Sequence, residues 1–131
     1  MTIGQIAQRA GVGVETVRFY ERRGLLARPP RPTSGFRDYP PATVDRIVFI
    51  RRAKELGFQL REIKELLLLR VRSGANCGTV KRRATDKLEE IQGKIADLRR
   101  MKRTLTQLVA ACDRRAPTAE CPVLGTLAKR A

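Results

Sequence analysis

The 131-residue sequence contains no histidine and no tryptophan, and it has only three cysteines, Cys77, Cys112 and Cys121. Without histidine, a cysteine nucleophile lacks its usual activating base, and no motif places another base near a thiol, which argues against an enzyme. An odd number of cysteines also argues against a framework of disulfides. We therefore expect the three thiols to be reduced and free to bind a ligand.

Long apolar segments are absent as well. No run of about 18 residues is apolar enough to cross a bilayer. The first residues, MTIGQIAQRAGVG, lack the apolar core and the small-residue cleavage site of a signal peptide. These features predict a cytoplasmic protein without a membrane partner.

Acidic residues are few: 13 stand against 28 lysines and arginines, for a net charge of +15 and an isoelectric point near 11.2. A charge this large favours a polyanionic partner, and nucleic acid is a better candidate than an acidic membrane surface. The alternative is a basic surface that only keeps the protein soluble.

Proline and glycine cluster in residues 27–41, ARPPRPTSGFRDYPP, which cannot continue a helix and predict a loop or a hairpin. Two short helices separated by a turn at residues 11–13 are expected before it. The apolar face of the first helix consists of Ile3, Ile6, Ala7 and Ala10. After the loop we expect two further helices, broken near Gly57.

A fifth, much longer helix is expected from Thr79 to about Arg115, where Pro117 would stop it. A heptad pattern runs through it at Leu88, Ile91, Ile95, Leu98, Lys102, Leu105, Val109 and Cys112. The small domain before this helix cannot cover such a seam, which favours pairing with a second copy of the chain. A long core helix of a monomeric bundle is the alternative, but the rest of the chain supplies few apolar helices to cover it.

Two short helices joined by a glycine turn match a helix-turn-helix, whose second helix enters the major groove of DNA. That second helix is expected over residues 15–23, with Thr16, Arg18 and Tyr20 as contacts. Arg37 and Tyr39 in the segment GFRDY lie two residues apart, the spacing of a wing that touches the backbone. The interface predicted here therefore combines a recognition helix with a wing.

The cysteines are far apart in sequence. Cys77 and Cys112 would be separated by about 52 Å along one helix, so one chain cannot bring them together. If two copies of the helix pair antiparallel and Cys77 of one lies opposite Cys112 of the other, the two helices cross near residues 94 and 95. The middle of the apolar seam lies between about residues 94 and 98, so the two estimates of the crossing point agree. The chain after Pro117 would then turn back and deliver Cys121.

Three thiolates without histidine suit a soft metal ion with trigonal sulfur coordination better than a closed zinc site, which has four ligands. The alternative is that each cysteine is a small buried apolar residue, the commonest fate of a free cysteine.

The strings TIGQIAQRAGVGVETVRFYERRGLL, GFRDY and VDRIVFIRRAKELGFQLREIKELL resemble the MerR family of dimeric transcriptional regulators, over residues 2 to about 127. The resemblance implies a winged helix-turn-helix that binds double-stranded promoter DNA with an overlong spacer. It also implies that an effector makes the dimer distort this spacer, so that bound RNA polymerase can start.

The stretches KIADLRRM, LVAAC and ECPVL are similar to mercury-responsive members of that family. This similarity implies Hg(II) as effector, held by Cys77 of one subunit and by Cys112 and Cys121 of the other, with repression without metal and activation with it. Lead-responsive relatives also use three cysteines, whereas copper-sensing relatives lack a cysteine at the position of Cys77. A lead- or cadmium-responsive regulator, or an architectural DNA-binding protein with structural cysteines, remains an alternative.

The fold expected from these features is mainly all-α, with a winged helix-turn-helix followed by a long antiparallel coiled-coil dimerisation helix. Residues 1–73 would form the DNA-binding domain. Residues 74–116 would hold the start of the metal site and the dimerisation helix, and residues 117–131 a metal-binding loop with a short C-terminal helix.

Overall fold

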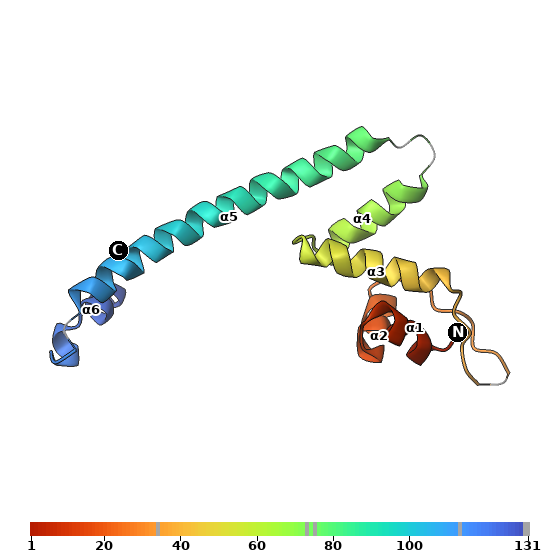
Figure 1. The fold of residues 1–131 in the computed structure, drawn as a ribbon, viewed down its shortest axis with the longest axis horizontal. Coiled ribbons are helices and arrows are strands. Elements are labelled where there is room, and N and C mark those ends of the chain that lie inside the picture. Colours follow the sequence, from red (N-terminus) through yellow and green to blue (C-terminus); the bar gives the residue numbers. More distant parts are fainter. Residues whose placement is uncertain (34, 73, 75, 113, 130–131) are drawn as a thin grey trace. The chain divides into compact units, whose positions relative to one another are not determined.

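The computed structural model describes residues 1–33, 35–72, 74, 76–112 and 114–129. Over these residues the chain is helical and contains no β-strand, as expected for an all-α protein. Figure 1 shows the order of the elements, which are α1 (Ile3–Ala10), α2 (Val14–Arg22), α3 (Ala42–Glu55), α4 (Leu60–Val71), α5 (Cys77–Ala111), a 3₁₀ helix (Thr118–Glu120) and α6 (Pro122–Ala128). The chain divides into two compact units, Met1–Arg82 and Arg83–Ala131.

Local signals explain why α1 and α2 form a helix-turn-helix. The Thr2 side chain accepts a hydrogen bond from the Gln5 amide, and the Gln5 side chain accepts one from the Thr2 amide, which caps the start of α1. Gly11 ends α1 in the left-handed conformation, at φ 73°. The extended Gly13 then starts α2, so the chain turns within three residues.

The core of the first unit is formed by the apolar faces of four helices. Helix α1 packs against α2 and α3, and α3 packs against α4. The predicted face of α1 is confirmed, because Ile6, Ala7 and Ala10 are buried and Ile3 packs against them. The fully buried side chains from the other helices include Val17, Ile47, Ile50 and Ile63. This core fixes α2 on the surface of the unit.

Of the two forms expected for residues 27–41, the loop is the one observed, because the described part of this segment contains no strand. Prolines at positions 29, 30 and 32 have no N–H to donate to a β-ladder. Other groups hold the loop: the Tyr39 amide donates to the Met1 carbonyl over 2.7 Å, and Arg37 Nε donates to the Pro29 carbonyl over 2.9 Å. The N-terminal ammonium also forms an ion pair with Asp38.

Helix α5 is the long helix expected from the heptad pattern, but its ends differ from the prediction. It begins two residues earlier, at Cys77, because the Asn76 side chain accepts hydrogen bonds from the Gly78 and Thr79 amides and caps it. It ends at Ala111, well before Pro117. The Cys112 amide bonds to the carbonyl of Val109, three residues back, which is the tighter turn typical of a helix end.

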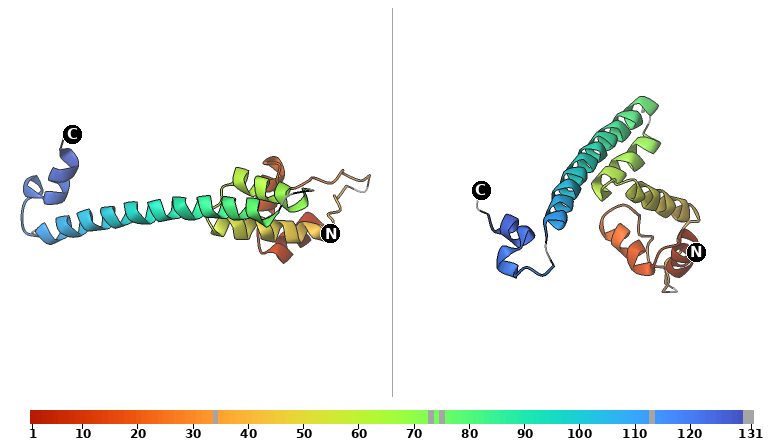
Figure 2. Two further views of the ribbon diagram at one scale, coloured as in Figure 1. Left: turned by 90° about the horizontal axis from the view of Figure 1, so that it is seen from above. Right: turned by 60° about the vertical axis from the view of Figure 1, so that its left-hand side comes forward.

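The predicted seam of α5 is largely uncovered by the chain itself. Its side chains keep large exposed fractions, such as 41% for Ile95, 61% for Leu98 and 67% for Val109. In both views of Figure 2, α5 runs without a break, and the chain turns beyond its end into the segment that holds α6. None of the helices in the described ranges is long and apolar enough to cross a membrane.

Candidate DNA interface and thiol site

Helix α2 presents a mixed polar surface. Arg18 is exposed and forms an ion pair with Glu15, one turn earlier, with 3.4 Å between Nη1 and Oε1. Thr16 is half-buried, and the Arg23 guanidinium lies 5.9 Å from the centre of the Phe19 ring. The helix therefore carries cationic donors that can reach phosphates or base edges.

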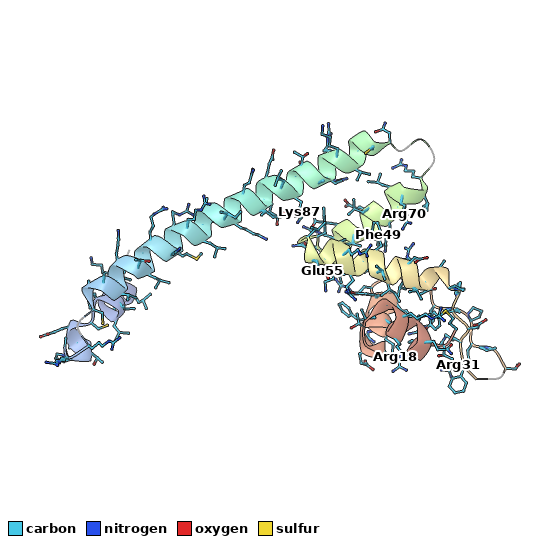
Figure 3. All side chains as sticks on the ribbon, viewed as in Figure 1. Arg18, Arg31, Phe49, Glu55, Arg70 and Lys87 are labelled. Carbon is cyan, nitrogen blue, oxygen red and sulfur yellow. The ribbon has the colours of Figure 1, made fainter. Side chains whose placement is uncertain are left out.

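Four arginines line a single hollow beside α2: Arg18 from the helix, and Arg28, Arg31 and Arg37 from the loop. We refer to these four residues as the arginine hollow. Figure 3 shows Arg18 and Arg31 near each other on one side of this unit. The structure thus brings together Arg18 and Arg37, which the sequence predicted, and adds Arg28 and Arg31, which only their charge could have indicated.

Tyr20 and Tyr39, predicted as DNA contacts, are instead part of the core, with 3% of each residue exposed. Burial is the main reason why the pKa of each phenol is raised. The neighbouring Glu21 carboxylate raises the pKa of Tyr39 further, while Arg37 and Arg28 lower it. Both rings pack in the core and Tyr39 also lines the arginine hollow, so their contact with a duplex stays a prediction.

Glu21 was not predicted, because one glutamate on a helix carries no signal in the sequence. Its side chain is only 3% exposed and accepts two hydrogen bonds from the loop. Tyr39 Oη donates to Oε1 over 2.9 Å, and Arg28 Nε donates to Oε2 over 3.2 Å. An acidic group therefore lies directly beside the arginine hollow.

The thiols lie at the two ends of α5. Cys77 is the first residue of the helix, whereas Cys112 follows its last residue, and both are exposed. A continuous helix of this length keeps the two residues about 52 Å apart. One chain therefore does not bring Cys77 to Cys112.

Cys112 and Cys121, in contrast, are neighbours within one chain. Cys121 is the residue before α6, and its pKa is lowered mainly by a hydrogen bond from the Leu124 backbone amide. The Val123 amide and the Cys112 thiol also donate to the Cys121 sulfur, while desolvation opposes these effects. These donors favour the thiolate of Cys121, the form that binds a metal.

Two adjacent thiols fit a soft metal ion, but they do not complete a trigonal site. Among the residues whose positions are described, no three Cys, Asp or Glu side chains of one chain lie close enough to hold a metal. Cys77, the third thiol, is exposed at the start of α5.

Comparison with known proteins identifies the family. A family model described as "MerR HTH family regulatory protein" matches residues 1–69, and another, described as "MerR, DNA binding", matches residues 44–108. A mercuric resistance operon regulatory protein from Pseudomonas fluorescens is 44% identical over 127 residues, which cover 97% of this chain and 87% of that protein.

Two solved structures are similar over the whole chain. The regulator PbrR691 from Ralstonia metallidurans CH34, in complex with lead(II), has a TM-score of 0.85 at 38% identity, covering 98% of this chain and 99% of that one. The regulator MerR from Bacillus megaterium MB1, in complex with mercury(II), has a TM-score of 0.70 at 43% identity, covering 98% and 100%. The chain belongs to the MerR family of helix-turn-helix regulatory proteins and is a DNA-binding regulator rather than an enzyme.

Proposed function

We propose that the protein is a mercury(II)-responsive transcriptional regulator of a mercury-resistance operon. It represses its promoter without metal and activates it by distorting the promoter DNA when Hg(II) is bound. One observation carries this proposal: Cys112 and Cys121 both lie beyond one end of α5, while Cys77 lies at the other end. A three-thiolate site then needs a second chain, which makes metal binding a property of the dimer.

The metal site we propose combines Cys112 and Cys121 of one subunit with the partner subunit's Cys77. An antiparallel pairing of α5 through its exposed seam opposes the two ends of the helix and forms two such sites per dimer. Hg(II) supplies a soft Lewis acid that prefers thiolate ligands. The residues of the chain supply the thiolates, and the amides of Leu124 and Val123 in the first turn of α6 lower the pKa of Cys121.

Promoter DNA is the proposed partner of the predicted DNA-binding domain, residues 1–73, which lies within the first unit, Met1–Arg82. The arginine hollow and α2 would contact phosphates and base edges through Thr16, Arg18 and Arg37, of which Arg18 is exposed and the other two are half-buried. RNA polymerase bound at the same promoter is the second macromolecular partner, because activation by DNA distortion acts on the polymerase.

A lead(II)-responsive regulator is the second candidate. The observation that favours it is the TM-score of 0.85 to a lead complex, against 0.70 to the mercury complex. Sequence identity ranks these two structures in the opposite order, at 38% and 43%. Because a mercuric resistance operon regulatory protein is also 44% identical over 97% of this chain, mercury is the main proposal.

Transcription from the promoter with purified protein and polymerase tests this function. We expect repression without metal, activation by stoichiometric Hg(II) in the presence of a competing thiol, and little response to Pb(II) or Cd(II). Cys121→Ala should bind the promoter but give no activation. Stronger activation by Pb(II) than by Hg(II) would select the second candidate, and binding of many sequences without any metal response would indicate an architectural protein.

A further inference from the structure

Glu21 poses an electrostatic problem for a DNA-binding surface. It adjoins four arginines that would face phosphates, and an acidic group there repels the same phosphates. Because its side chain is 3% exposed, water screens its charge poorly. If charge alone mattered, the protein would bind DNA more tightly without this carboxylate.

The contacts of Glu21 show what the carboxylate does in the free protein. It lies on α2 and uses one oxygen for Tyr39 and the other for Arg28, so that it joins the helix to both ends of the intervening loop. Within this segment, Arg37 also donates to Pro29, which ties the two sides of the loop together. Two hydrogen bonds to one charged acceptor are strong enough to order a loop rich in proline.

We propose that Glu21 is a positioning residue for DNA recognition, whose carboxylate holds Arg28 and Tyr39 against α2 so that the arginine hollow keeps a fixed geometry. This inference rests on the DNA interface proposed above. It assigns to a buried acid a favourable role in binding a polyanion. A glutamine is a weaker substitute: with its carbonyl oxygen toward Arg28 and its NH₂ toward the Tyr39 hydroxyl it can make two contacts, but both lack the charge that strengthens those of the carboxylate.

The test compares Glu21→Gln with Glu15→Gln. Both substitutions remove one negative charge from α2, but the Glu15 side chain is 82% exposed and only forms the ion pair with Arg18. Binding is measured to an operator duplex selected from a random pool by the wild-type protein, and to a random duplex of equal length. We expect Glu21→Gln to weaken operator binding about tenfold or more, the size of losing a hydrogen bond to a charged group. Glu15→Gln should bind both duplexes as well as the wild type or better.

Two further measurements separate positioning from misfolding and from a wrong interface. Tyr39→Phe, which removes one hydrogen bond without changing charge, should weaken operator binding by a smaller factor. Hydrogen exchange without DNA should show faster exchange of the loop amides, such as that of Tyr39, in Glu21→Gln than in Glu15→Gln, while the core helices stay protected.

The outcomes are distinct. Wild-type protein that selects no operator would overturn the proposed function, and the exchange comparison would still decide whether Glu21 orders the loop. Equal exchange in the two variants, or operator binding by Glu21→Gln as tight as by Glu15→Gln, would overturn the positioning role.

Discussion

Arg37 and Tyr39 show how neighbouring residues of one motif acquire different roles. In a strand, residues two apart point to the same side, and on this basis both were predicted to face DNA. The loop is not a strand, and the two side chains differ in burial: both line the hollow beside α2, but Arg37 is half-buried, whereas Tyr39 is buried in the core. The charge of Arg37 was enough to predict its place in a polyanion-binding surface. The position of Tyr39 depends on its hydrogen bond to Glu21, which is 18 residues away in the sequence.

Replacing an arginine of the hollow should change the salt dependence of DNA binding. Arg18→Ala or Arg37→Ala should weaken operator binding and reduce the slope of log K against log salt by about one phosphate contact. Fluorescence anisotropy at several salt concentrations measures this slope. Arg61→Ala removes the same charge from an exposed position on α4 and should leave this slope unchanged. An unaltered slope in both hollow variants would move the interface elsewhere.

At the scale of the element, the turn between α1 and α2 depends on Gly11. Its φ of 73° disfavours any side chain, and a Cβ added there would lie 2.6 Å from Nη1 of Arg51. The same guanidinium caps the end of α1, because Arg51 Nη1 donates a hydrogen bond to the Ala10 carbonyl over 2.9 Å. A cation at the C-terminal end of α1 is favourable.

Gly11→Ala should therefore lower the free energy of unfolding by about 1 to 2 kcal/mol through backbone strain and displacement of Arg51. Gly13→Ala is the matched control, since Gly13 has a φ of −81° and nothing lies within 4 Å of an added Cβ. Urea denaturation compares the two. A loss in Gly13→Ala as large as that in Gly11→Ala would contradict the role of the left-handed turn.

Helix α5 illustrates how far periodicity predicts an element. The heptad pattern correctly indicated one long helix and its apolar seam, because both depend on residue spacing alone. Its ends depend on local hydrogen bonds, which a periodic pattern does not contain: the Gly78 and Thr79 amides donate to the Asn76 side chain at the start, and the Cys112 amide donates to the Val109 carbonyl at the end. The predicted break near Gly57 is confirmed, because α3 ends at Glu55 and α4 begins at Leu60.

The exposed seam predicts that a charge at its centre prevents dimerisation. Ile95→Asp would bring two carboxylates close together near the crossing point, in an interface that excludes water. Light scattering at micromolar concentration should then show monomers. Ala96→Asp adds the same charge on the exposed neighbouring residue, outside the seam, and should remain dimeric. A full dimer of Ile95→Asp would exclude this seam as the interface.

At the scale of the whole molecule, the three thiols could be selected from the sequence because no histidine competes with them as a soft ligand. The distance along α5 was also predictable, since it follows from helix geometry. The sequence could not show that the Cys112 thiol lowers the pKa of Cys121, because this depends on how residues 114–121 turn back before α6. Nor does one chain contain the partner that would complete the site.

Mixed dimers test whether the metal site is shared between chains. A Cys77→Ala subunit and a Cys112→Ala subunit should each fail to form a three-sulfur site alone, yet their mixed dimer should recover one, made of the first subunit's Cys112 and Cys121 and the second subunit's Cys77. Metal stoichiometry and X-ray absorption measure the recovery. A wild-type subunit paired with a triple Cys→Ala subunit is the control, and it should hold at most a two-sulfur ion, since Cys77 and Cys112 of one chain stay about 52 Å apart. If the control dimer held mercury with three sulfur ligands and the mixed dimer held none, one chain would supply every ligand. Helix α5 would then have to break to bring Cys77 to Cys112.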